Sequence, residues 1–202
     1  MILAGALLLQ GCSLFSGDSA QQGREQALRE MAWSFAEDAV ELVISADPGL
    51  NTYDGQAHSL LLVVAQVQEP NGFSGYTSNG QRLVQLLLSE QAPAGMPGLT
   101  RIFIEPGEQR RVRLPRLENS RYIGLAAGYA HLDPARSARL YRIGVGITEK
   151  GFWSTHYRAA PEPLVIDLLL GADGILRGPG SRPADLVPEQ PKAGEVRLAP
   201  SP

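Results

Sequence analysis

The alternation of apolar and polar side chains predicts a series of β-strands. In residues 39–45, Val40, Leu42 and Ile44 alternate with other positions at the period of a half-buried strand. Residues 59–68 form a continuous apolar run with β-branched residues, which indicates a strand covered on both faces, or else a buried helix. Further predicted elements are a hairpin over 101–115 that turns at Pro106-Gly107, and strands over 121–130, 139–147 and 163–170. Many short strands joined by turns predict a β-sandwich.

One segment has the period of a helix instead. In residues 82–91, Leu83, Leu86 and Leu87 fall on one face, and Asn79-Gly80 before them forms a break. We therefore expect a small helical insertion, at about 72–92, within a mainly β sandwich domain that spans 33–176.

The N-terminus carries a short apolar run followed by the one cysteine of the chain. Residues 2–9 are apolar apart from Gly5, and a run of this length cannot cross a bilayer, which needs about 20 apolar residues. It has the length of the apolar region of a signal peptide. We predict a signal peptide over 1–11. Because no Lys or Arg precedes the run, we expect its basic part to be truncated.

The position of Cys12 indicates a covalent lipid. A lone cysteine inside a domain is usually a small buried hydrophobe, but this one precedes the predicted domain. Leu9-Gln10-Gly11-Cys12 resembles a bacterial lipobox, which implies cleavage after Gly11 and acylation of Cys12. Ser13 follows, where an Asp would suggest retention at the inner membrane. We therefore expect a protein anchored by lipid to the outer membrane and facing the periplasm.

The two ends of the mature chain are polar. Residues 12–32 are interpreted as the lipidated cysteine and a tether, flexible at first and helical near its end, around Leu28 and Met31. As a coil it would reach roughly 25 Å. Residues 177–202 are rich in proline and polar side chains, with too little apolar surface to fold alone, and are predicted to be a disordered tail.

The connection between the first two predicted strands, 46–58, is long. Hairpin loops usually have two to five residues, and longer loops are often functional. We interpret this one as a partner-binding loop with Leu50 and Tyr53 as exposed anchors; alternatively, both side chains fold back onto the core. Deleting 49–54 is then expected to weaken partner binding and leave the fold intact. The candidate binding residues are Asp47, Pro48, Gly49, Leu50, Asn51, Thr52, Tyr53, Asp54, Gly55 and Gln56.

Composition and charge narrow the class of protein. Apolar residues make up 44% of the chain and charged residues 19%, as in an ordinary globular domain. The formal net charge of −3 argues against nucleic-acid binding, which calls for a basic surface.

Catalytic and metal-binding motifs are not found. His58, His131 and His156 are far apart and belong to no metal-binding motif. No G-x-S-x-G elbow is present. We therefore predict a non-enzymatic protein with no metal and no cofactor other than the lipid on Cys12. Two alternatives stay open: a lipoprotein that binds a sugar or peptidoglycan fragment, and a hydrolase that unites His131 or His156 with carboxylates.

Short motifs spread over residues 40–147 carry a family resemblance. They are Asp47-Pro48-Gly49-Leu50-Asn51, Gly55, Gln66-Val67, Phe73, the Leu-rich segment 82–91, Pro106-Gly107-Glu108 and Tyr122-Ile123-Gly124-Leu125-Ala126-Ala127-Gly128-Tyr129. With the lipobox, this set resembles the TssJ (SciN) family, the outer-membrane lipoproteins of the type VI secretion system. Two positions differ: Ala130-His131 stands where an Arg commonly follows the aromatic, and Tyr141-Arg142 replaces a Trp-Arg pair.

The resemblance implies a fold and a partner. The fold would be a transthyretin-like two-sheet β-sandwich with a small helical insertion. The partner would be the periplasmic C-terminal domain of TssM, a large inner-membrane protein of the type VI membrane complex, bound partly through the loop at 46–58. The protein would then anchor a trans-envelope assembly to the outer membrane.

Overall fold

The computed structural model describes residues 15–151, 155–176 and 195–196. The predicted signal peptide, Cys12 and most of the predicted tail lie outside the described residues. The chain forms two compact units: one contains residues 33–144 and the chain from 161 onwards, and the other contains the chain up to residue 32 together with 145–160. The stretch predicted as one domain, 33–176, is thus interrupted by residues 145–160.

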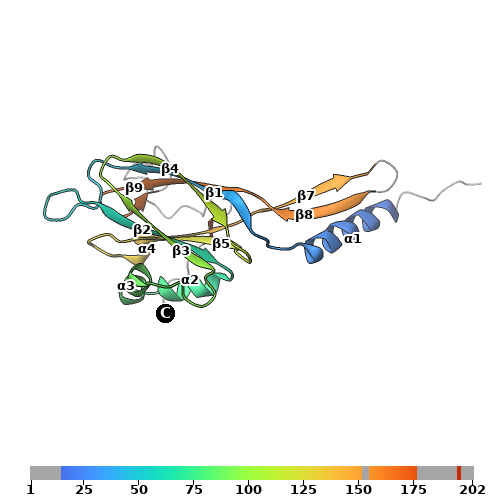
Figure 1. The fold of residues 1–202 in the computed structure, drawn as a ribbon, viewed down its shortest axis with the longest axis horizontal. Coiled ribbons are helices and arrows are strands. Elements are labelled where there is room, and N and C mark those ends of the chain that lie inside the picture. Colours follow the sequence, from blue (N-terminus) through green and yellow to red (C-terminus); the bar gives the residue numbers. More distant parts are fainter. Residues whose placement is uncertain (1–14, 152–154, 177–194, 197–202) are drawn as a thin grey trace, which may run out of the picture. The chain divides into compact units, whose positions relative to one another are not determined.

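The larger unit is a β-sandwich, which confirms the predicted fold class (Figure 1). Its strands are β1 (Ala36–Ala46), β2 (Leu60–Val67), β3 (Gly98–Ile104), β4 (Gln109–Arg116), β5 (Tyr122–Ala127), β6 (Ala138–Arg142), β9 (Leu164–Leu170), β10 (Ile175–Leu176) and β11 (Glu195–Val196). One sheet has the order β10-β9-β1-β4 and the other β11-β6-β5-β2-β3. Within the first sheet, β1 runs antiparallel to β4 and parallel to β9. Within the predicted tail, β11 pairs with β6.

The core between the sheets follows the predicted alternation. Val40, Leu42 and Ile44 of β1 are all buried, as their period of two requires. The strand β2 is buried on both faces: Leu62 and Val64 belong to the core between the sheets. Val63, Ala65 and Val67 belong to a second cluster on the opposite face. The apolar run at 59–68 is therefore a strand and not a helix.

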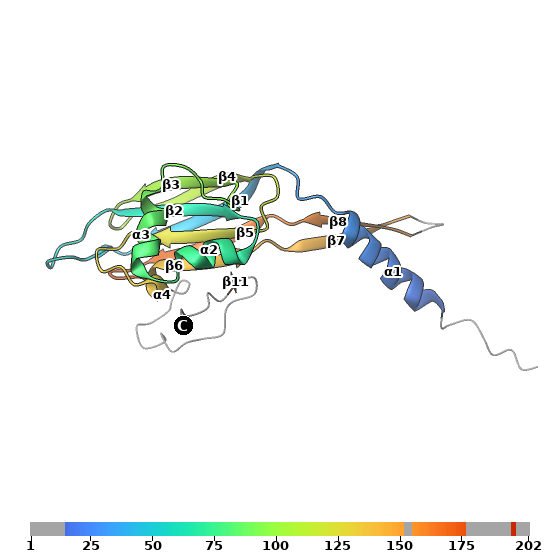
Figure 2. The same cartoon turned by 90° about the horizontal axis from the view of Figure 1, so that it is seen from below.

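Two helices cover the outer face of the second sheet. They are α2 (Pro70–Tyr76) and α3 (Gly80–Leu88), which lie across β2 and β5 in Figure 2. Asn79 caps α3, because its side chain accepts a hydrogen bond from the backbone N–H of Arg82 at 2.9 Å. Phe73 of α2 is fully buried against Gly124 of β5, where a Cβ atom would lie 2.5 Å from the Phe73 ring. The helical insertion is confirmed.

The predicted strand at 139–147 is wrong in its extent. The chain leaves the sandwich after β6, and β7 (Val145–Lys150) pairs instead with β8 (His156–Pro161) in a separate two-stranded sheet. At the point of departure, a Cβ atom on Gly144 would lie 2.7 Å from a carboxylate oxygen of Glu162. The backbone N–H of Glu162 donates a hydrogen bond to the carbonyl of Gly144 at 2.8 Å, which closes the base of the β7–β8 hairpin.

The smaller unit contains this hairpin and α1 (Phe15–Glu30). The prediction of a tether that is helical only near its end is wrong, because the helix already begins at Phe15. Its 16 residues span roughly 24 Å at 1.5 Å per residue. Among the described residues, no helix has the length and apolar character needed to cross a bilayer.

Candidate functional site

The loop between β1 and β2 is fastened to the sandwich at its base. The backbone N–H of Asp47 donates to the carbonyl of Leu170 at 2.8 Å, at the end of β9. The Asp47 carbonyl accepts from Gly107 at 3.1 Å, in the turn between β3 and β4. Farther along the loop, the backbone N–H of Thr52 donates to the carbonyl of Ala172 at 2.8 Å. The loop is therefore held by two neighbouring turns.

The first half of the loop is folded inward. An Asp47 carboxylate oxygen accepts a hydrogen bond from the N–H of Gly49 at 2.7 Å, and the hydroxyl of Thr52 donates to the carbonyl of Gly49 at 2.6 Å. This turn directs Leu50 into the core between the sheets, where it is 0% exposed. The expectation that Leu50 is an exposed anchor is therefore wrong, and it packs as part of the sandwich.

Asn51 joins this loop to the one that follows β5. It has a φ of +49°, a backbone conformation that Asn tolerates better than most residues. Its buried side chain donates to the carbonyl of Ser59 at 3.1 Å and accepts from the N–H of Ala130 at 2.8 Å. The position of the loop is thus fixed by a side chain as well as by its base.

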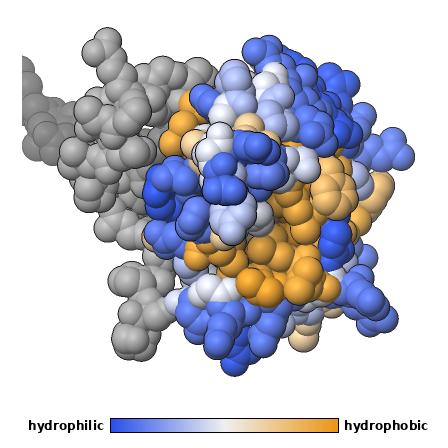
Figure 3. Space-filling model, turned by 90° about the vertical axis from the view of Figure 1, so that its left-hand side faces the viewer, coloured by the Kyte–Doolittle hydropathy of each residue, from blue (hydrophilic) through white to orange (hydrophobic). Residues whose placement is uncertain are grey.

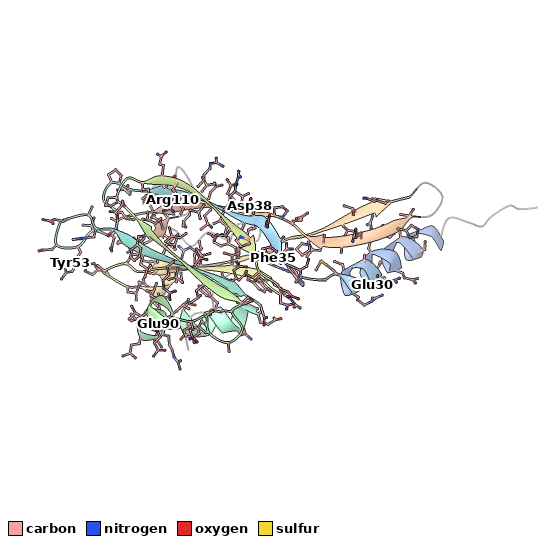
Figure 4. All side chains as sticks on the ribbon, in the orientation of Figure 1. Glu30, Phe35, Asp38, Tyr53, Glu90 and Arg110 are labelled. Carbon is pink, nitrogen blue, oxygen red and sulfur yellow. The ribbon has the colours of Figure 1, made fainter. Side chains whose placement is uncertain are left out.

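The tip of the loop is a tight turn that presents Tyr53. The backbones of Tyr53 and Gln56 exchange two hydrogen bonds, at 2.9 and 3.0 Å. Asp54 and Gly55 between them have positive φ values of +50° and +73°, as in a two-residue type I′ turn. Tyr53 is 55% exposed, and Figure 4 shows it at the outer end of the sandwich. Of the two predicted anchors, only Tyr53 is exposed.

Two histidines flank Tyr53. The ring of His131 lies 5.9 Å from the Tyr53 ring and that of His58 lies 6.4 Å away, measured between centroids. A ring nitrogen of His58 is also 3.3 Å from the Tyr53 carbonyl oxygen. Sequence reasoning missed this group because His58 and His131 are far apart in the chain. The antiparallel pairing of β2 with β5 brings them to one end of the sheet.

This end of the sandwich has an apolar surface. Figure 3 views the molecule from the side that carries Tyr53 in Figure 4 and shows hydrophobic residues gathered between polar ones. Large apolar side chains with exposed surface in the larger unit include Phe103 of β3 and Leu88 of α3. A surface that combines exposed aromatic and aliphatic groups with a polar rim is typical of protein–protein contacts.

The site has no arrangement suited to metal binding. In the described part of the chain, no three His, Cys, Asp or Glu side chains lie close enough to hold a metal ion. His58 and His131 both lie beside the ring of Tyr53. Tyr129, close to the same loops, is buried, and burial raises the pKa of its hydroxyl group. That hydroxyl therefore stays protonated at neutral pH.

Similarity to known proteins identifies the family to which this chain belongs. The model of the family described as "Type VI secretion lipoprotein, VasD, EvfM, TssJ, VC_A0113" matches residues 38–146, more than half of the chain. The chain belongs to this family. The match covers β1 to β6, and therefore the whole of the β1–β2 loop, and it ends at the start of the β7–β8 hairpin. No curated protein matches the sequence.

Solved structures of type VI secretion lipoproteins are similar at low sequence identity. TssJ1 from Pseudomonas aeruginosa is 22% identical, with 73% of this chain and 98% of that chain covered and a TM-score of 0.48. Serratia marcescens Lip, a membrane-bound component of the type VI secretion system, is 18% identical, with 73% and 99% covered and a TM-score of 0.51. A chain in a structure of the TssM C-terminal domain from EAEC is 15% identical, with 69% and 97% covered and a TM-score of 0.50. Among these, Lip and the EAEC chain support the fold assignment.

Proposed function

We propose that this type VI secretion lipoprotein is anchored by lipid on Cys12 to the periplasmic face of the outer membrane. In this proposal the β1–β2 loop binds the periplasmic C-terminal domain of TssM and thereby fixes the trans-envelope complex to that membrane. The role is structural: two attachments on one chain raise the local concentration of the partner at the membrane, and no reaction is required.

The observation that carries the proposal is the exposed Tyr53 on a loop that is otherwise immobilised. Aromatic side chains contribute large contact areas with little loss of conformational entropy, and they are enriched among the residues that dominate binding energy. Because the base of the loop and Asn51 are already hydrogen-bonded to the sandwich, little ordering is needed when a partner binds. The similar chain in the structure of the TssM domain from EAEC makes TssM the first partner to test.

The anchor rests on the sequence around Cys12. A covalent acyl chain contributes about 0.8 kcal/mol for each buried CH₂ group, and stable anchoring takes more than one chain. A triacylated Cys12 would therefore stay at the membrane. Mass spectrometry of the N-terminal peptide of the mature protein tests this part directly, and an unmodified Cys12 would remove the anchor from the proposal.

Binding is tested by calorimetry with the soluble mature chain and the TssM periplasmic domain. Tyr53→Ala is expected to weaken binding by tenfold or more, about 1.4 kcal/mol or above, if Tyr53 lies at the centre of the contact. Phe35→Ala is the matched control, because Phe35 is equally exposed at 54% and lies at the other end of the sandwich in Figure 4. Equal dissociation constants for the two variants would exclude the loop tip as the contact.

A substitution at the tip is a better test than deletion of 49–54. The deletion would remove Leu50 from the core and Asn51 from its hydrogen bonds, so loss of binding could follow from loss of structure. From these contacts we expect the deletion of 49–54 to disturb the fold, in place of the sequence-based expectation that it leaves the fold intact. Tyr53 contributes to neither of these contacts through its side chain, and its replacement leaves the backbone of the turn able to form.

A further inference from the structure

The smaller unit lies largely outside the part of the chain that the family model matches. The match spans 38–146, whereas α1 ends at Glu30 and the β7–β8 hairpin runs from Val145 to Pro161. Family membership therefore gives these segments no role. Their sequence position does suggest one, because α1 begins three residues after Cys12, the proposed site of the lipid.

Close packing joins α1 to the hairpin. A Cβ atom on Gly23 would lie 2.5 Å from Cδ2 and 2.9 Å from Cε2 of Tyr157, so the helix backbone rests directly on this aromatic ring. Ala27, one turn later on the same face of α1, is buried with 6% of its surface exposed. The lack of a side chain at Gly23 allows the close approach, and any side chain added there would collide with the ring.

A charged group fixes the rotation of the helix on the hairpin. The guanidinium of Arg24 donates to a carboxylate oxygen of Glu149 on β7 at 2.5 Å. The same guanidinium lies 5.5 Å from the centre of the Tyr157 ring on β8. Arg24 therefore contacts both strands, beside the place where Gly23 meets Tyr157.

Docking is expected to stabilise α1. Even alanine-rich isolated helices shorter than about 12–15 residues are marginal in water, and α1, with 16 residues, exceeds this length only slightly and has a glycine in its middle. Glycine lowers helix propensity more than any other residue except proline. A glycine at position 23 thus weakens the free helix and is favourable only where the helix meets Tyr157.

We propose that α1 and the β7–β8 hairpin form a stalk, in which Gly23 seats the helix on Tyr157 so that the lipid is attached to a docked helix and not to a free tether. The hairpin enters and leaves the sandwich at residues 144 and 161, where the Glu162–Gly144 hydrogen bond closes its base. The helix α1 is thereby connected to the sandwich through the hairpin as well as through the linker at 31–35. The attachment of lipid rests on the function proposed above, whereas the docking of α1 does not.

Disulfide trapping tests the docked geometry. Replacing Cys12 by Ser gives a background without cysteine, because the chain has only one. In that background the pair Gly23→Cys and Tyr157→Cys is expected to form an intramolecular disulfide, since a Cβ atom at position 23 would lie 3.6 Å from Cγ of Tyr157. Gln22→Cys with Tyr157→Cys is the matched control, because Gln22 is exposed on α1. Equal disulfide yields from the two pairs, or none from the first, would overturn the docking.

Hydrogen exchange tests whether docking stabilises the helix. Gly23→Leu replaces a poor helix former by a good one, so a free helix would gain protection. In the stalk, the leucine collides with Tyr157, and the amides of α1 are expected to exchange at least tenfold faster than in the native chain. The control Gln22→Leu is expected to keep native protection, and the sandwich amides are expected to be unchanged in both. Equal or slower exchange of α1 in Gly23→Leu would show that α1 is not docked through this face.

The lipid is tested separately from the docking. Mass spectrometry of the N-terminal peptide from the Gly23→Leu variant, expressed with its signal peptide, is expected to show acylated Cys12. An unmodified Cys12 in both the native protein and this variant would overturn the membrane role of the stalk and leave the trapping and exchange results to stand on their own.

Discussion

The side chain of Asn51 accepts a hydrogen bond from the backbone N–H of Ala130 at 2.8 Å, and this contact couples the β1–β2 loop to the loop after β5. The two loops carry Tyr53 and His131, whose rings lie 5.9 Å apart. A buried amide therefore determines how an exposed aromatic group is presented. The residue that holds the site in place is not a residue that a partner can touch.

Asn51→Ala is expected to destabilise the sandwich and to loosen the loop. It leaves the Ala130 N–H without its partner, which costs about 1–3 kcal/mol, and it places alanine at a positive φ, which costs about 1–2 kcal/mol more. Urea unfolding measures the change in free energy. Asn119→Ala is the control, because Asn119 also has a positive φ of +64° but is exposed. If both variants lose the same stability, the hydrogen bonds of the Asn51 side chain contribute nothing.

Gly124→Ala is expected to destabilise the larger unit by about 1–3 kcal/mol, because the added methyl group would lie 2.5 Å from the ring of Phe73 and overpack the cluster. Gly72→Ala is expected to stabilise the same unit instead. A Cβ atom at Gly72 meets nothing within 4 Å, and alanine is the better helix former in α2 by roughly 0.5–1 kcal/mol. Thermal unfolding is expected to give a lower midpoint temperature for Gly124→Ala and a higher one for Gly72→Ala than for the native chain. A stable Gly124→Ala variant would show that Phe73 moves easily.

The ion pairs of Glu41 are expected to stabilise the fold only above the pH at which this group titrates. The hydrogen bond from Arg111, at 2.6 Å, lowers the pKa of Glu41 below its ordinary value of 4.5, and the charge of Arg113 acts in the same direction. A carboxyl group whose pKa is lower in the folded state contributes stability above the unfolded pKa, and this contribution is lost as the pH falls through the folded pKa. Glu41→Gln is therefore expected to be less stable than the native chain at pH 7.

A double-mutant cycle with Arg111→Gln isolates the pair. The coupling energy between the two substitutions is expected to be measurable by urea unfolding at pH 7 and to be smaller at pH 3, where the carboxyl group is more protonated. Because the Arg111 side chain is 71% exposed, although that of Glu41 is only 18% exposed, the coupling energy is also expected to decrease at high salt. A coupling energy that is the same at pH 3 and pH 7 would contradict the assigned pairing.

Cys12→Ser is expected to release the protein from the membrane. The variant cannot carry the acyl chains that supply the proposed attachment. When cells that express the full chain are fractionated, the variant is expected in the soluble periplasmic fraction and the native protein in the outer-membrane fraction. Secretion is expected to fail in cells with the variant. Ser13→Ala is the matched control. Normal secretion by the Cys12→Ser variant would show that the anchor is dispensable.

The sequence predicted the sandwich well because its strands bury alternate residues. The period of two at Val40, Leu42 and Ile44 survives in the structure, and so does the leucine face of α3. The family followed from short motifs in the same region, and the family match confirms it. These features are local, so they are visible in a single sequence.

The site was predicted less completely because its contacts are not local. Leu50 and Tyr53 have the same sequence context, and only the fold decides that one is buried and the other exposed. His131 reaches Tyr53 through the pairing of β2 with β5, which no local pattern specifies. The extent of the helix α1 was underestimated because its first turns are rich in Ser, Gly and Asp and because its contact with Tyr157 comes from a distant part of the chain.

The place of β1 in the chain has a mechanical consequence. Its first residue, Ala36, follows the linker after α1, and its last, Ala46, leads directly into the loop that carries Tyr53. If the proposed lipid anchor and partner contact both hold, the part of a pull that passes through this linker would run along eleven residues of backbone that is already extended and cannot lengthen much further. β1 is hydrogen-bonded to β4 on one side and to β9 on the other, so shearing it out of the sheet would require both ladders to break at once.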